Sequence, residues 1–123
     1  MTMERDYLLL PQGNGSRFDE DTLARMRAYW EGAPFYVRGD GAYVVCLDEE
    51  TREAVLKYRG VDQPNSVSHV LLFGPERVVL GSQGWPELDA QFADFVEWCQ
   101  KRWPCKLFLA TGEPTPVSEL RHE

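Results

Sequence analysis

The chain has 123 residues, of which 43% are hydrophobic and 12% aromatic, and its formal net charge is −7. The length fits one compact domain, and the apolar content excludes an intrinsically disordered chain. Because the acidic excess repels phosphate groups and anionic lipids, we expect neither a nucleic acid nor a membrane surface as a partner. Such a charge serves solubility in general, or it attracts a basic protein partner.

The cysteines and the N-terminal segment indicate an intracellular protein. Cys46, Cys99 and Cys105 make an odd count without a Cys-x-x-Cys pair, which disfavours a secreted disulfide scaffold. In the segment MTMERDYLLLPQGNG, the apolar stretch has only four residues and acidic residues precede it, unlike in a signal peptide or a membrane span. We therefore expect a cytoplasmic protein with reduced cysteines.

The first part of the chain predicts a strand and then a helix. Residues 6–10 form a short apolar run that is typical of a buried strand. Asp19 has the side chain of a helix N-cap and Gly32 is a typical helix stop, so we expect a helix over about residues 20–31. Its apolar face recurs at spacings of three and four residues and consists of Leu23, Met26 and Trp30.

The middle of the chain contains a hairpin and one ambiguous segment. Residues 35–38 and 42–47 are strand-like runs around a Gly-Asp-Gly sequence, which predicts a β-hairpin. Residues 48–59 fit both the spacing of a helix and the alternation of a hairpin arm. We favour the helix, because Asp48 is a good N-cap and Gly60 is a good stop.

The second half predicts two strands, a long helix and a last strand. Residues 67–73 are apolar on both faces, as expected of a central strand, and residues 77–80 run back after a turn. We expect the long helix over about residues 87–103, followed by a proline that blocks its continuation, and the last strand over residues 106–110. The apolar stripe of this helix is formed by Leu88, Phe92, Phe95, Cys99 and Trp103.

The order of these elements predicts the fold class. It is β-α-β-β-(α)-β-β-α-β, with the ambiguous segment in parentheses. Hairpins interrupted by helices favour an α+β fold, with a mixed or antiparallel sheet and two or three helices packed on it. We expect residues 1–123 to form a single compact domain, in which residues 111–123 make an extended C-terminal tail that begins with turn-forming residues.

The LGSQG sequence around Ser82 is the strongest candidate for a catalytic motif. It lies between a predicted strand and a predicted helix, as the nucleophile of an α/β-hydrolase does. That motif requires glycine two residues before the serine, however, and Leu80 stands there. A glycine-rich connecting loop is the favoured interpretation. The glycine loop at residues 12–16 lacks the third glycine of a dinucleotide site, so we expect no cofactor.

His69 lies within the strongest predicted strand, where a lone histidine is more often a satisfied core residue than a ligand or a base. A zinc site needs three or four ligands, and His69 and the three cysteines match no known ligand spacing. We therefore expect no metal site. Cys46 and Cys99 are interpreted as small buried hydrophobic residues.

Acidic and aromatic side chains carry the leading functional hypothesis, a non-catalytic domain that binds a basic protein. An inhibitor of the immunity or antitoxin type is its concrete form. Aromatic rings beside acids suit a protein interface, where Trp and Tyr dominate the binding energy. The candidate partner-binding residues are Asp48, Glu49, Glu50, Trp85, Asp94, Glu97 and Trp98.

The alternative hypothesis is a small enzyme or ligand-binding domain with a pocket near His69 and the Ser82 loop. Cys46 is the third candidate residue for that pocket. The two hypotheses differ in what should surround His69. A deep pocket, with a carboxylate within hydrogen-bonding distance of the imidazole, would favour chemistry or ligand binding.

The cysteine pattern generates a first prediction. We expect no intramolecular disulfide in the native protein, because the count is odd and Cys46 and Cys99 lie on elements that are predicted to be buried. The intact mass under non-reducing conditions should equal the mass with three free thiols. A mass lower by two hydrogens would contradict this expectation.

Overall fold

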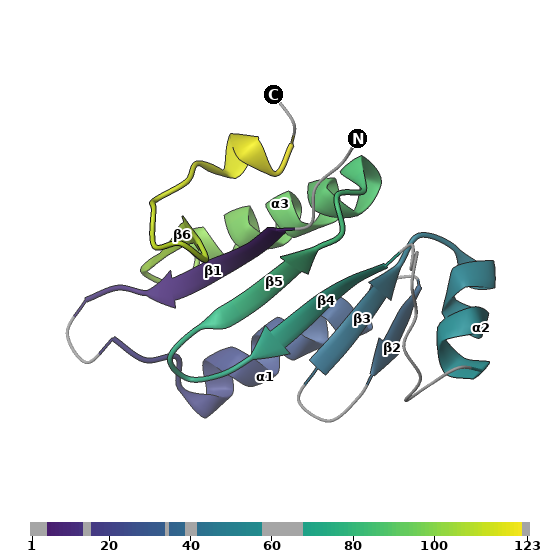
Figure 1. Ribbon diagram of the computed structural model, residues 1–123. Helices are drawn as coiled ribbons and strands as arrows, with labels where there is room; N and C mark the ends of the chain where they lie inside the picture. The colour runs from purple at the N-terminus through teal and green to yellow at the C-terminus, as the bar shows by residue number, and fades with distance from the viewer. Residues whose placement is uncertain (1–4, 14–15, 34, 39–41, 58–67, 122–123) are drawn as a thin grey trace.

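A computed structural model describes residues 5–13, 16–33, 35–38, 42–57 and 68–121. These residues form one α+β domain with the element order β-α-β-β-α-β-β-α-β (Figure 1). The elements are β1 (Arg5–Pro11), α1 (Glu20–Glu31), β2 (Tyr36–Arg38), β3 (Ala42–Cys46), α2 (Glu49–Lys57), β4 (Ser68–Phe73), β5 (Val78–Ser82), α3 (Pro86–Gln100), β6 (Cys105–Leu109) and the short 3-10 helix η1 (Val117–Glu119).

The sheet has six strands in the order β2-β3-β4-β5-β1-β6, and every neighbouring pair is antiparallel. The predicted fold class is therefore confirmed, with an antiparallel rather than a mixed sheet. The first strand lies inside the sheet, between β5 and β6. β4 lies between β3 and β5, as the apolar residues on both of its faces predict.

Both N-terminal helices begin where their capping residues predict. Asp19 Oδ1 accepts a hydrogen bond of 2.8 Å from the backbone N–H of Thr22, and Asp48 Oδ1 accepts one of 2.8 Å from that of Thr51. These backbone hydrogen bonds lower the pKa of Asp19 and of Asp48, because they favour the ionised carboxylate. The ambiguous segment is thus a helix as far as Lys57, whereas its expected stop and the hairpin turn at residues 39–41 lie outside the described residues.

α3 ends three residues earlier than the sequence predicts. Its last helical residue is Gln100, and Lys101 is the C-cap. Pro104 contributes to the difference, because it has no N–H to donate to the Gln100 carbonyl and its ring would clash with that carbonyl in a longer helix. Trp103 therefore lies beyond the helix, where its ring packs edge-on against Trp98 at 5.3 Å between centroids. No described helix is long and apolar enough to span a membrane.

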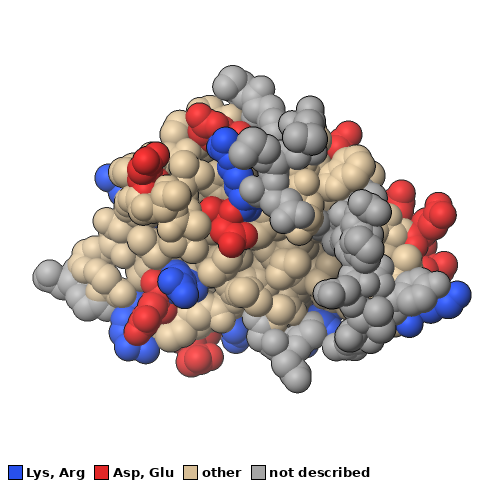
Figure 2. All heavy atoms as spheres, in the orientation of Figure 1, with Lys and Arg blue, Asp and Glu red and all other residues tan. Residues whose placement is uncertain are grey.

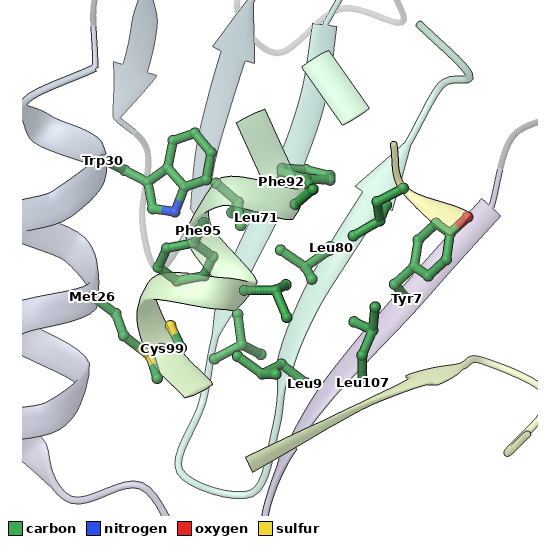
Figure 3. Packing of buried hydrophobic residues seen from close by; sticks show 14 of the residues in the cluster. Tyr7, Leu9, Met26, Trp30, Leu71, Leu80, Phe92, Phe95, Cys99 and Leu107 are labelled. Atoms are coloured by element: carbon green, nitrogen blue, oxygen red, sulfur yellow. The ribbon is translucent and has the colours of Figure 1, made fainter. Parts of the chain in front are cut away.

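The core lies between one face of the sheet and the helices α1 and α3 (Figure 3). The ring of Trp30 on α1 packs against Phe92 and Phe95 of α3, at 5.9 and 5.2 Å between centroids. Leu71 and Leu80 of the sheet complete this core, and all five side chains are buried. The indole N–H of Trp30 has no hydrogen-bond partner among the described residues, so this side chain contributes packing alone.

The opposite face of the sheet, which we call the outer face, carries a row of apolar side chains. Phe108 lies opposite Leu8, Leu8 opposite Val79, and Val79 opposite Leu72, so the row crosses β6, β1, β5 and β4. Leu72 is 45% exposed, and the other three are half-buried. α1 and α3 cover the other side of the sheet, and α2 contacts β2 and β3.

The C-terminal segment differs from the extended tail that the sequence predicts. Residues 113–115 pair with the outer edge of β6, through hydrogen bonds of 2.8 Å from Leu109 N to Glu113 O and 3.1 Å from Thr115 N to Leu107 O. η1 follows and packs against α3, and Leu120 is fully buried in the core. The apolar side chains of Val117 and Leu120, together with the hydrogen bonds to β6, account for this return to the domain.

The position of Phe92 generates a second prediction. The Phe92 side chain projects from α3 and is fully buried against α1 and the sheet. Phe92→Ala should therefore lower the free energy of unfolding by about 3–5 kcal/mol, through lost transfer free energy and the cavity that it leaves. Glu97→Ala removes only a partly exposed ion pair with Arg121 and should cost about 1 kcal/mol or less. Urea unfolding of both variants measures the two values. Equal losses would contradict the assignment of the buried face.

Candidate functional site

His69, Ser82 and Asp89 form a buried polar cluster at the start of α3. His69 Nε2 lies 2.7 Å from Asp89 Oδ1, and the Ser82 hydroxyl donates to the same oxygen at 2.6 Å. All three side chains are almost completely buried, and the His69 side chain has no exposed surface. The structure thus brings together two residues that the sequence identifies, His69 and Ser82, through a carboxylate that the sequence analysis missed.

The hydrogen bonds fix where the protons lie. The backbone N–H of Gln83 donates to His69 Nδ1 at 3.1 Å, so Nδ1 carries no proton. Nε2 then carries the proton of the neutral ring and donates it to Asp89. The Ser82 oxygen accepts a hydrogen bond of 3.0 Å from the backbone N–H of Gly84, and its own O–H points toward Asp89.

This proton arrangement differs from that of a catalytic serine. In a hydrolase triad the serine hydroxyl donates to the histidine, which then takes the proton as a general base. Here the Ser82 hydroxyl donates to the carboxylate, and the lone pair of His69 Nδ1 already accepts the N–H of Gln83. The cluster has the residue types of a triad but connects them in another order.

The cluster instead fastens the loop that joins β5 to α3. His69 belongs to β4, Ser82 ends β5, and Asp89 lies in the first turn of α3. Gly84 has a φ of 87°, in the left-handed region that favours glycine, and this conformation directs its N–H toward Ser82. The loop therefore leads into α3 with a fixed geometry and leaves Trp85 37% exposed.

Cys46 does not join this cluster. Val45 lies directly opposite His69 in the sheet, and consecutive side chains in a strand point to opposite faces, so Cys46 points away from His69. Burial raises the pKa of the Cys46 thiol to about 11 and that of the Cys105 thiol to about 11, and it raises the pKa of Cys99 as well. At neutral pH these thiols are protonated and poor nucleophiles.

The candidate partner-binding residues lie in three separate places. Asp48, Glu49 and Glu50 are exposed at the start of α2, and Trp85 precedes α3. The solvent-facing side of α3, which is not part of the outer face of the sheet, carries Asp94, Glu97 and Trp98. Figure 2 shows red acidic groups at the right, where Figure 1 places α2, and a largely uncharged area across the sheet.

The acidic pair on α3 is partly neutralised by the chain itself. The Arg121 guanidinium donates to Asp94 Oδ1 at 2.7 Å and lies 3.1 Å from Glu97 Oε2. Trp98 is half-buried, with its ring 4.9 Å from Tyr29 and 6.2 Å from Phe95 between centroids. The Arg102 guanidinium covers this ring at 4.4 Å from its centroid. Trp98 is thus a packed residue at the margin of the core, with a cation above it.

The described residues contain no group of three His, Cys, Asp or Glu side chains that could hold a metal ion. No family model, curated protein or solved structure matches this chain. Any functional proposal therefore depends on the residues and their geometry.

The buried cluster generates a third prediction. Asp89→Ala leaves two buried donors, those of His69 and Ser82, without their acceptor and should lower the free energy of unfolding by about 2–6 kcal/mol, at about 1–3 kcal/mol for each donor. Ser82→Ala removes one hydrogen bond to the Asp89 carboxylate and the acceptor of the Gly84 N–H, and it should cost about 1–3 kcal/mol. Urea unfolding of both variants gives the comparison. If Asp89→Ala cost no more than Ser82→Ala, Asp89 would not be the centre of the cluster.

Proposed function

We propose that this domain is a non-catalytic protein-binding domain whose partner is a basic protein. The observation that carries the proposal is the apolar row Phe108-Leu8-Val79-Leu72 on the outer face. Contiguous apolar surface of this kind marks interaction sites on soluble proteins, whereas single exposed apolar residues need no explanation. Neighbouring strands lie about 4.8 Å apart, so the row extends about 14 Å across the sheet.

The shape of the outer face supports contact with another macromolecule rather than with a small molecule. The row lies on a continuous antiparallel sheet, and Val70 and Leu10 add half-buried aliphatic side chains beside it. A protein partner can cover such a broad surface, whereas small ligands bind in concave sites that enclose most of their area.

Charge supports the choice of a basic partner, although it acts away from the row. Among the described strand residues of the outer face, Asp6 is the exposed acid and Lys106 the exposed base, so their charges balance. The net charge of −7 therefore acts through the rest of the surface, including α2. Long-range attraction of this kind mainly speeds association, while the apolar contacts slow dissociation. An inhibitor of the immunity or antitoxin type, which must capture a basic protein rapidly, is the concrete form of the proposal.

The buried cluster supports this proposal over the enzymatic alternative. Asp89 does supply the carboxylate near His69 that chemistry would require. The His69 side chain has no exposed surface, however, and the Ser82 hydroxyl donates its hydrogen bond to the Asp89 carboxylate rather than to the imidazole. Because the polar atoms of His69, Ser82 and Asp89 already form hydrogen bonds within the domain, a structural role is favoured.

The outer face generates a fourth prediction. Leu72→Asp places a charge at the most exposed position of the apolar row, at its β4 end, and should abolish capture of a basic partner from native lysate. Ala24→Asp is the matched control: it adds the same charge at an exposed position of α1, on the other side of the sheet. Both variants should fold, because both positions are exposed, and thermal melts check this first.

Mass spectrometry of affinity-captured protein gives the result. Capture of the same basic protein by the native chain and by Ala24→Asp, and not by Leu72→Asp, is the expected outcome. Capture that Leu72→Asp leaves unchanged would remove the outer face from the proposal. The absence of any basic protein from all three samples would oppose the proposed function itself.

A further inference from the structure

A surface hollow of about 380 Å³ lies between the C-terminal end of α1 and the solvent-facing side of α3. It is distinct from the outer face, because α1 and α3 cover the other side of the sheet. The residues that line it are Tyr29, Trp30, Gly32, Ala33, Gln91 and Asp94. Its walls thus combine the half-buried ring of Tyr29, one amide and one carboxylate, whereas the ring of Trp30 is almost completely buried.

The electrostatics of the hollow favour a cation. α1 ends beside it, and the carbonyl end of a helix carries a partial negative charge. The last turn of α1 contains no basic residue that would offset this charge. Asp94 adds a carboxylate whose side chain is 61% exposed and whose charge Arg121 partly neutralises. Burial, and to a lesser extent the charge of Asp94, raise the pKa of Tyr29, so the field of this carboxylate reaches the aromatic wall.

The aromatic wall is held rigidly before any ligand arrives. The Tyr29 ring lies 5.4 Å from Trp30, 5.2 Å from Phe95 and 4.9 Å from Trp98 between centroids. Each of these neighbours packs against further core residues. A preformed aromatic surface beside a carboxylate is the arrangement that recognises cationic side chains, through cation–π contact and charge-assisted hydrogen bonds.

The chain's own arginines show both contacts within the same region. Arg121 donates to Asp94 at 2.7 Å, so this carboxylate already accepts a guanidinium from one side. Arg102 covers the ring of Trp98, which is a neighbour of Tyr29. The planar guanidinium suits both contacts better than the compact ammonium of lysine.

We propose that this hollow binds an arginine side chain of the partner protein, with the guanidinium on Asp94 and the stem against Tyr29 and Ala33. This proposal rests on the proposed function, because it names the chemistry by which a basic partner is recognised. The intramolecular Arg121 competes for the same carboxylate. Its release therefore increases the affinity of the hollow for an external guanidinium.

The test needs no partner protein. N-acetyl-arginine amide is titrated into the folded protein, and the NMR shifts of the Tyr29 and Trp30 ring protons and of the Gln91 side-chain amide are followed. We expect saturable shifts with a dissociation constant on the order of millimolar. N-acetyl-citrulline amide, in which a neutral urea replaces the guanidinium, should bind at least about fivefold more weakly.

Three variants locate the contact. Asp94→Asn should weaken binding of the arginine probe by about fivefold. Glu97→Gln is the matched control, because Glu97 also pairs with Arg121 but does not line the hollow, and it should change the affinity by less than about twofold. Arg121→Ala should tighten binding by about two- to fivefold, since it removes the competing guanidinium while Leu120 still anchors the segment.

The proposal is overturned if no saturable shift occurs at the lining residues, if the citrulline probe binds as well as the arginine probe, or if Asp94→Asn and Glu97→Gln act alike. Its failure is distinguishable from that of the proposed function, which depends on the outer face. Partner capture that Leu72→Asp abolishes, together with no binding of the arginine probe, would retain the partner and reject the hollow.

Discussion

The Asp89 carboxylate is the interaction on which the arrangement of the domain depends. A buried carboxylate is tolerated only when donors surround it, and here those donors come from two strands that precede α3 in the chain. His69 supplies one from β4 and Ser82 supplies another from the end of β5. α3 can therefore begin only at one position relative to the sheet. That position sets which side of α3 enters the core, and hence where Phe92 meets Trp30.

The two faces of the sheet differ in role: one is buried in the core, and the other carries the apolar row. The aromatic core under α1 and α3 supplies most of the buried apolar surface, so the outer face contributes less to holding the domain together. Aliphatic residues that remain half-buried there are thus available for another role. The acidic surplus is carried mainly on helices and loops rather than on the apolar row, and in the proposed function it speeds encounter with a basic partner.

Local signals predicted local structure well. Asp19 and Asp48 fixed the starts of two helices, because a capping side chain acts on backbone groups only three residues away. Asp89 was missed because its partner in β4 is distant in sequence. One signal was present: Asp89 shares a helix face with Phe92 and Val96, and a charge on an apolar face requires a partner. The hollow brings Gly32 and Asp94 together, and a contact between two helices that are distant in sequence leaves no periodic pattern.

The place of β1 between β5 and β6 has a consequence for the order of folding. Leu8 finds Val79 on one side and Phe108 on the other, so the earliest strand obtains both neighbours only after most of the described chain is available. The β2-β3 hairpin, by contrast, can close locally. Contacts between segments so widely separated slow folding, because the entropy of closing the loop is lost before the pairing is gained. During synthesis, β1 thus remains unpaired, with its apolar side chains exposed, until β5 and β6 have been made. We expect its pairing to complete the sheet last.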